Sequence, residues 1–243
     1  MKIALASKEF VNKDMQKNIS TIIETMIIAK QNNADMICFG EAFLQGFDSL
    51  SWDYESDKKI IALKLSSTPI KTIAQAAKDI GICVSFGFIE NEENLLYCSY
   101  VVINEFGDII YNFKRVSPGW KELFADNNYY KEGDSFSTFQ YKNFTFTVGL
   151  CWDFWNDTNI IKAGNLKKDI TLWPLYVSFS IQDFESKYKQ EYVERASKLN
   201  SRVLFINSLS KDPDAFGGCF EFYDGQILNE LPFGEEGLLY VEV

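Results

Sequence analysis

Three polar side chains stand where runs of strand-forming residues end. Glu41 follows MICFG, Lys114 follows IIYNF, and Cys151 follows FTVGL. In layered α/β folds the carboxyl ends of neighbouring strands converge on one ligand crevice, so these side chains are expected to meet there. A carboxylate with a raised pKa takes the proton of a thiol, and a lysine ammonium favours the thiolate and stabilises an oxyanion. Together the three residues fit an acyl-transfer site.

Each residue taken alone also has a structural interpretation. Glu41 fits a solvated loop acid, Lys114 a lysine on a sheet edge, and Cys151 a small buried apolar residue. The chain contains no histidine, which excludes Ser-His-Asp and Cys-His catalysis and histidine-ligated metals. Any catalysis must therefore use carboxylate, lysine, cysteine, tyrosine or hydroxyl groups, and this restriction favours the acyl-transfer interpretation.

Composition narrows the classes of partner. The formal net charge of −10 argues against a nucleic-acid partner or an anionic membrane surface. The apolar run in the N-terminal MKIALASKEF is too short for a signal peptide, and no later apolar run reaches membrane-spanning length, so a cytoplasmic protein is expected.

Five cysteines without a CxxC pair predict neither a disulfide framework nor a zinc site. Phosphate-binding glycine motifs are absent, and no cofactor or metal is expected.

The pattern of elements predicts an α/β layered fold. Helices are expected at 14–33, 69–80, from Cys151 to Gly164, and at 182–199. Strands are expected at 3–7, 35–41, 82–90, 95–104, 108–116, 143–151, 169–174, 202–207, 217–222, 226–230 and 237–242. No linker, repeat or low-complexity tract divides the chain, which predicts a single domain over residues 1–243.

The chain resembles a known family. Glu41 in FGEAFLQGF, Lys114 in YNFKRV and Cys151 in VGLCWD are similar, in order and approximate spacing, to the Glu–Lys–Cys triad of the carbon–nitrogen hydrolases (nitrilase superfamily). Further likeness over nearly the whole chain lies in GFIENEENLLYCSYVVINEFGDIIYNFKR, NNYYKEGDSFSTF, ERASKLNSRVLFIN and GGCFEFYDGQIL. The resemblance implies a four-layer α-β-β-α sandwich. It also implies a homodimer that pairs through the helix after the cysteine and the helix at 182–199.

The resemblance also implies a catalytic cycle. Glu41 would act as the base on Cys151, whose thiolate attacks an amide or related carbon. Lys114 and the backbone N–H of Trp152 would hold the oxyanion, and Glu41 would protonate the leaving amine and activate a water. Many members carry a second glutamate near the lysine. Here Glu122, eight positions after Lys114, is the candidate, and a surface acid in WKELFADNN is the alternative.

Two departures from the family pattern stand out. Gly40 precedes the base where the family commonly has proline, and FWNDTN replaces the usual residues after Cys-x-Asp. The unusual segment Phe154–Asp157 is expected to alter the wall behind the nucleophile and the choice of substrate. The chain lies at the short end for the family, so a C-terminal extension used in subunit contacts is expected to be absent.

The residues around the cysteine suggest a substrate class. CWDFW partly resembles N-carbamoylputrescine amidase-like members, which favours a small linear amide or N-carbamoyl amine as substrate. Trp152, Phe154, Trp155 and Trp173 are the candidate substrate-binding residues, with packing in the core as the alternative. Asp153 is interpreted as a helix N-cap or structural hydrogen-bond acceptor.

Other functions are also compatible with this sequence. The altered FWNDTN segment is compatible with a binding or regulatory protein that kept the fold without catalysis. A thiol-redox protein using Cys151 is a further possibility, although no partner cysteine lies nearby in the sequence. Nitrile hydrolysis and acyl transfer use the same triad and are alternatives within the enzyme interpretation.

Overall fold

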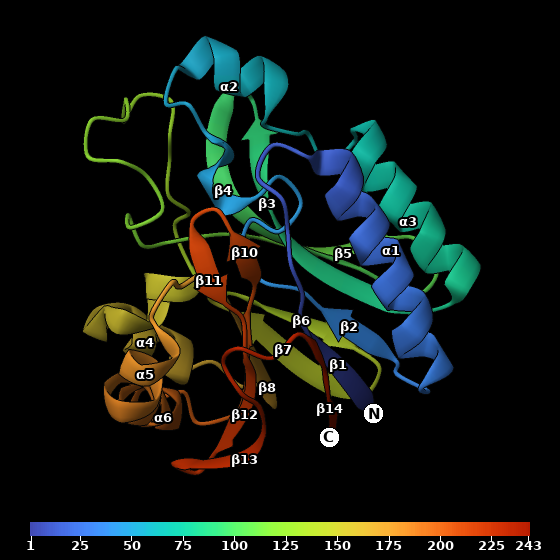
Figure 1. Cartoon of the computed structure of the whole chain (residues 1–243), viewed down its shortest axis with the longest axis vertical. Helices are drawn as coiled ribbons and strands as arrows, with labels where there is room; N and C mark the ends of the chain where they lie inside the picture. Colours follow the sequence, from blue (N-terminus) through green and yellow to red (C-terminus); the bar gives the residue numbers. More distant parts are fainter.

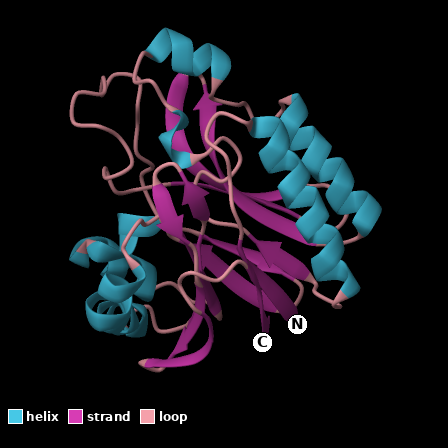
Figure 2. Cartoon of the chain, viewed as in Figure 1, coloured by secondary structure: helices cyan, strands magenta, loops and turns pink.

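Two six-stranded sheets lie face to face in the computed structural model, which describes residues 1–243 (Figures 1 and 2). The first sheet has the order β14 (Gly237–Glu242), β1 (Lys2–Ser7), β2 (Met36–Cys38), β3 (Cys83–Glu92), β4 (Leu95–Ile103), β5 (Ile109–Lys114). The second has the order β13 (Gln226–Leu231), β12 (Cys219–Tyr223), β9 (Arg202–Asn207), β8 (Ile170–Leu175), β7 (Phe144–Val148), β6 (Thr138–Tyr141). A separate hairpin joins β10 (Leu209–Lys211) and β11 (Asp214–Phe216).

Helices cover the outer face of the first sheet. The pair α1 (Met15–Gln31) and α3 (Thr68–Ile80) packs on it, and the short helix α2 (Tyr54–Ile60) lies beyond one end (Figure 1). Alternation along β1 explains the layering, because successive strand residues point to opposite faces. Ala4 packs against the helices, whereas Ile3 packs into the core between the two sheets.

The second sheet is covered by the helices α4 (Asp157–Gly164), α5 (Ile181–Asp183) and α6 (Lys189–Ser197) (Figure 1). A π-helical turn joins α5 to α6, so the helix predicted at 182–199 exists but is irregular. The helix predicted from Cys151 begins instead as a 3-10 turn over Cys151–Trp155, and α4 starts after the N-cap Asn156. With the inner core between the sheets, the layers follow the predicted order α-β-β-α.

Strand directions bring the candidate residues to one edge. Strands β1, β2 and β3 are parallel, as are β7, β8 and β9. Strand β5 is antiparallel to β4, which is antiparallel to β3, so β5 runs in the same direction as β2. The loops after β2, β5 and β7 supply the candidate site.

The two ends of the chain meet. Strand β14 pairs antiparallel with β1, and the N-terminal ammonium of Met1 donates to the carbonyl of Val243 at 2.7 Å. The termini lie side by side at one end of the sandwich (Figure 2). None of the helices combines the length and the apolar character needed to cross a bilayer.

Candidate active site

Cys151 sits in an unusual backbone conformation directly after β7. Its φ is +40°, in the left-handed region that residues other than glycine rarely adopt, and its side chain is buried. The indole Nε1 of Trp173 donates to the Cys151 carbonyl at 2.9 Å and helps to hold this turn. Backbone conformations of this kind persist only where the surroundings impose them, and they gather at functional sites.

The Cys151 thiol is neutral until a base acts on it. Burial raises its pKa to about 12, and the nearby charge of Glu41 acts in the same direction. The Arg115 guanidinium and the backbone N–H of Tyr176 oppose this shift, and both favour the thiolate. A nucleophilic role for Cys151 therefore requires a proton acceptor within the site.

Glu41 is the carboxylate beside this thiol. It follows β2, is completely buried, and its Oε1 accepts hydrogen bonds from Arg115 Nη1 at 2.7 Å and from Cys98 Sγ at 3.4 Å. Its backbone N–H donates to the Leu175 carbonyl at 3.2 Å, which ties the loop after β2 to the second sheet. The other carboxylate oxygen, Oε2, has no hydrogen-bond partner although it is buried.

Gly40, where the family pattern commonly has proline, is packed too closely for any side chain. A Cβ on Gly40 would lie 2.2 Å from Ser208 Oγ and 2.8 Å from the Leu175 carbonyl oxygen. Ser208 and the end of β8 therefore occupy the space next to the backbone that positions Glu41. The departure from the family pattern has a steric reason in this chain.

The structure places Lys114 outside the cluster formed by Glu41 and Cys151. Its Nζ forms an ion pair with Glu92 and lies 4.3 Å from the centroid of the Tyr97 ring. These residues line a surface groove of about 590 Å³ beside β5, the edge strand of the first sheet. Lys114 therefore contacts neither Glu41 nor Cys151.

Arg115 occupies the position that was predicted for the lysine. Successive strand residues point to opposite faces, so the side chain one position after Lys114 enters the space between the sheets. Arg115 is buried; its Nη1 donates to Glu41 and its Nε donates to Ser117 Oγ at 2.9 Å. Its Nη2 is buried without a hydrogen-bond partner.

The charges around Arg115 define a single cluster. Burial alone lowers the pKa of Arg115, but the negative charge of Glu41, with a smaller contribution from Asp153, holds it above its ordinary value. Arg115 is therefore a permanent cation next to both the carboxylate and the thiol. Sequence reasoning missed this residue, although the buried Phe113 two positions earlier already indicates which face of β5 points inward.

Asp153 links the cysteine turn to the loop after β5. Its Oδ2 accepts from the Leu150 N–H at 2.8 Å, and its Oδ1 accepts from the N–H groups of Val116 at 3.0 Å and Ser117 at 2.7 Å. Burial raises the pKa of Asp153 to about 6, and the charge of Arg115 opposes the shift. The interpretation of Asp153 as a structural acceptor is confirmed.

Glu122 lies outside this buried cluster. It is exposed in the loop between β5 and β6, and its backbone carbonyl accepts from the Ala125 N–H at 3.1 Å. Its carboxylate forms no ion pair with Arg115, whose carboxylate partner is Glu41. Its assignment as a second catalytic glutamate has no support from this geometry.

Three of the four predicted substrate-binding aromatics are part of the fold. Phe154 and Trp173 are fully buried, with ring centroids 5.3 Å apart, in the cluster beneath the second helical layer. Trp155 packs beside them against the helices, and the guanidinium of Arg195 lies 5.3 Å from its ring centroid. The burial of Phe154 and Trp173 favours the alternative of core packing.

Trp152 is the exception, because 60% of it is exposed. A Cβ added at Gly119 would lie 3.7 Å from Trp152 Cγ and 3.0 Å from Arg115 Nη2, so the three residues are neighbours. Trp152 therefore flanks the unpaired end of the guanidinium on the side that faces solvent.

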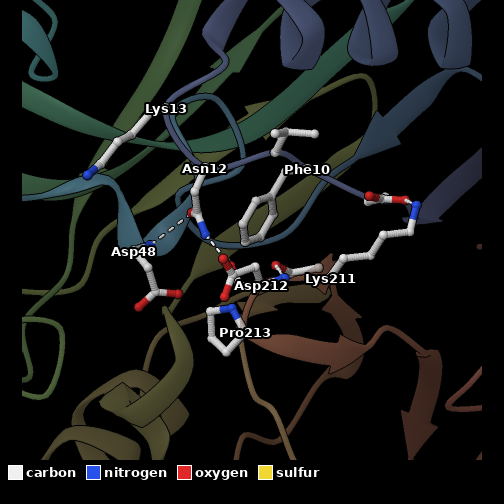
Figure 3. A pocket seen from close by; sticks show the side chains of 10 residues that line it. Phe10, Asn12, Lys13, Asp48, Lys211, Asp212 and Pro213 are labelled. Atoms are coloured by element: carbon white, nitrogen blue, oxygen red, sulfur yellow. Dashed lines mark hydrogen bonds and ion pairs between the residues drawn. The ribbon is translucent and has the colours of Figure 1, made fainter.

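A second surface groove, of about 460 Å³, lies between the segment after β1 and the β10–β11 hairpin (Figure 3). Asn12 spans it, since its Nδ2 donates to the Asp212 carbonyl at 2.7 Å and its Oδ1 accepts from the Asp48 N–H at 3.1 Å. Phe10, in the groove wall, packs on Tyr176 with ring centroids 5.1 Å apart. Tyr176 therefore packs beside the groove wall, and its backbone N–H favours the Cys151 thiolate.

Solved structures share the fold of the chain. An amidase from Nesterenkonia sp. matches with a TM-score of 0.83 and 17% identity over 100% of this chain and 90% of that chain. A glutamine-dependent NAD⁺ synthetase from Acinetobacter baumannii matches with a TM-score of 0.81 and 21% identity over 98% of this chain and 44% of that chain.

Relatives by sequence have several activities. A glutamine-dependent NAD⁺ synthetase from Thermotoga maritima is 24% identical over 100% of this chain and 42% of its own length. A cyanide hydratase from Stereum hirsutum is 28% identical over 94% of this chain and 70% of its own length. The chain thus spans less than half of the NAD⁺ synthetases that it matches.

One family description covers almost the whole chain. Residues 2–243 match the carbon–nitrogen hydrolases. This extent includes the cysteine turn, the buried carboxylate and all of the strands. The chain therefore belongs to the carbon–nitrogen hydrolase family.

Proposed function

We propose that the protein is a cysteine-dependent hydrolase of a non-peptide C–N bond, acting on a small linear amide or N-carbamoyl amine through a thioester on Cys151. Glu41 is the general base for the thiol and the acid for the leaving amine. Trp152 lines the approach to the site. Family membership supports the reaction class, and the likeness of CWDFW to N-carbamoylputrescine amidase-like members supports the substrate class.

One observation carries this proposal. The thiol in the left-handed turn lies beside a buried carboxylate, and that carboxylate keeps one oxygen, Oε2 of Glu41, without a hydrogen-bond partner. A buried oxygen without a partner is costly unless a ligand or a transferred proton satisfies it. The thiol proton and the N–H of an amide are both suitable partners for Oε2.

Relatives and structural neighbours support a small substrate that a thiol attacks. In the amidase from Nesterenkonia sp., variants of the active site hold acrylamide added at the cysteine, or the acetamide moiety of fluoroacetamide. Arylacetonitrilases are 25–29% identical to about half of this chain. An amide, a nitrile and a carbamoyl group each present an electrophilic carbon bonded to nitrogen.

The test is a panel of small primary amides, N-carbamoyl amines and nitriles, with released ammonia measured. Ammonia alone indicates a primary amide or nitrile, ammonia with carbon dioxide indicates an N-carbamoyl substrate, and transfer to an added amine indicates an acyltransferase. Cys151→Ala should abolish ammonia release with an unchanged circular dichroism spectrum. Cys219→Ala is the matched control, because Cys219 is a buried cysteine in β12 outside the site, and full activity is expected. Turnover by Cys151→Ala would overturn the mechanism.

A second candidate is a non-catalytic binding or regulatory protein with the same fold. The observation in its favour is that Lys114 lies outside the site, with an arginine at the neighbouring inward position. Labelling with iodoacetamide separates the two candidates. Fast labelling of Cys151 that slows in Glu41→Gln favours the enzyme, whereas equal and slow labelling of several cysteines favours the binding protein.

The homodimer is a proposal that rests on the second helical layer. Ile161 of α4 is 62% exposed, and Ile181 at the start of α5 is also exposed. Sedimentation should give a dimer that Ile161→Glu dissociates, whereas Ile27→Glu, at an exposed isoleucine on the other helical layer, leaves it intact. A monomeric unmodified protein contradicts the proposal.

A cytoplasmic location is likewise proposed, because the five cysteines are unpaired, and cell fractionation tests it.

A further inference from the structure

We propose that Arg115 is the catalytic cation of this site. Its Nη1 positions Glu41, and its Nη2 binds the oxyanion that forms when Cys151 attacks a carbonyl carbon. The inference rests on the proposed thioester chemistry at Cys151. It assigns the role of the family's lysine to a residue of a different chemical type.

The hydrogen bonds of Arg115 leave one guanidinium nitrogen, Nη2, available to a substrate. Nε is held by Ser117 Oγ at 2.9 Å, and Nη1 is held by Glu41 Oε1 at 2.7 Å. Nη2 is buried and has no partner. The guanidinium is planar, so the two held nitrogens fix the direction in which Nη2 presents its N–H groups.

The unsatisfied atoms of the site complement an amide. Nη2 of Arg115 is a donor without an acceptor, and Oε2 of Glu41 is an acceptor without a donor. A primary amide or carbamoyl group carries an acceptor oxygen and donor N–H groups on the same carbon. Such a group would satisfy both buried atoms while its carbon faces Cys151, whose thiol lies within the influence of both charges.

The chemical step balances without any change in the charge of Arg115. The Cys151 proton passes to Glu41, the sulfur–carbon bond forms, and the carbonyl oxygen becomes an oxyanion held by Nη2–H. The oxyanion collapses, the C–N bond breaks, and the nitrogen leaves with the proton from Glu41. A water then gives a proton to Glu41 and attacks the thioester, and the sulfur leaves to recover that proton. Arg115 keeps all of its protons throughout.

Replacing lysine by arginine changes the expected pH behaviour. A guanidinium does not titrate in the working range of a protein, whereas a buried ammonium does when its pKa is lowered. The unmodified protein should therefore show no alkaline loss of activity caused by its cation. A lysine at this position cannot hold Ser117 and Glu41 in the same fork geometry, and it adds a titrating group.

Turnover tests the assignment with three single variants. Arg115→Gln should lower kcat by about 10²–10³ with a smaller change in KM, because it removes an oxyanion donor. Arg115→Lys should keep more activity and gain a falling limb at alkaline pH. Lys114→Met is the matched control from the adjacent position, and its kcat and pH profile should match those of the unmodified protein. A 100-fold loss in Lys114→Met, together with wild-type kinetics in Arg115→Gln, would overturn the proposal.

The pH dependence of Cys151 alkylation gives a readout that needs no turnover. Glu41→Gln removes a charge that raises the thiol pKa, so its thiol pKa should fall. The double variant Glu41→Gln/Arg115→Gln removes the opposing cation as well, and its thiol pKa should rise again. This double variant also avoids an unpaired buried charge, so it serves if Arg115→Gln alone does not fold. Identical thiol pKa values in the single and the double variant would contradict the assignment.

The two proposals fail in different ways. If no amide, carbamoyl compound or nitrile is hydrolysed, the proposed function fails, while the alkylation profiles still report whether Arg115 acts on the thiol. If ammonia is released but the Arg115 variants keep wild-type kcat and thiol pKa, the hydrolase stands and the role of Arg115 is refuted.

Discussion

Nη1 of Arg115 lies 2.7 Å from Oε1 of Glu41, and neither side chain has any exposure to solvent. The two residues are 74 positions apart and come from the loop after β2 and the end of β5. A buried ion pair of this kind contributes little net stability but makes each partner depend on the other. It joins the proposed base to a permanent cation in the space between the two sheets.

Loss of one partner of this pair is expected to be more harmful than a neutral replacement. Glu41→Ala leaves the Arg115 charge buried and unpaired, at a cost of about 3–5 kcal/mol in unfolding free energy. Glu41→Gln keeps an acceptor oxygen for Arg115 Nη1, so it should be distinctly more stable, while its turnover falls for lack of a base. Urea unfolding of both variants measures the difference. Equal stability of the two would show that the ion pair does not matter for the fold.

Asp153 gives a pH dependence of stability whose sign follows from its pKa. Burial raises that pKa from 3.8 to about 6, so folding favours the protonated form. The contribution of protonated Asp153 to the stability of the folded protein is fully present below pH 3.8 and is lost as the pH rises through about 6. Relative to Asp153→Asn, which does not titrate, the unmodified protein should become less stable between these values. Unfolding of both proteins at several pH values tests this, and a constant difference would show that the pKa of Asp153 is not raised.

Trp173 is expected to support the cysteine turn through one hydrogen bond. Trp173→Phe removes the Nε1 donor to the Cys151 carbonyl, at about 0.5–1.5 kcal/mol for a typical hydrogen bond plus a small loss of packing. Because that bond holds the left-handed turn, alkylation of Cys151 should slow as well. Phe154→Leu is the control, since Phe154 packs in the same cluster and its side chain makes no polar contact. Equal alkylation rates in both variants would show that the Trp173 hydrogen bond does not position Cys151.

The tight packing at Gly40 predicts a steric effect beside the base. Gly40→Ala places a Cβ 2.2 Å from Ser208 Oγ, so we expect a loss of about 1–3 kcal/mol in stability. The double variant Gly40→Ala/Ser208→Gly should recover part of the loss, but not all, because the Leu175 carbonyl oxygen would still lie 2.8 Å away. Thermal unfolding measures both. Additive losses in the double variant would mean that Ser208 is not the obstacle.

The sequence predicts the architecture well because alternation and helical periodicity are strong over long segments. The sequence pattern predicts the long strands of the two sheets and the long helices that cover them. The positions of Glu41 and Cys151 at the ends of strands also predict that the two residues lie near each other. Short elements such as α2 and the β10–β11 hairpin were missed, because too few residues carry a periodic pattern there.

The basic residue that pairs with Glu41 lies one position after the lysine that the sequence pattern favours. Lys114 and Arg115 are both basic and adjacent, and a one-residue shift along a strand exchanges the two faces of the sheet. The inward position of Phe113, combined with strand alternation, assigns Arg115 to the site. Nothing in the composition of the aromatic segment distinguishes exposed Trp152 from buried Phe154, because that difference arises from the irregular 3-10 turn at Cys151.

The central claim is that an acyl group is carried by Cys151 during turnover. Rapid acid quenching of the protein with a substrate from the amide panel, followed by intact-mass and peptide mapping, tests it most directly. The proposed mechanism predicts one acyl group per chain, located on the peptide that contains Cys151 and absent in Cys151→Ala. Ammonia release that continues in Cys151→Ala, or an acyl group on another residue during turnover, would contradict it.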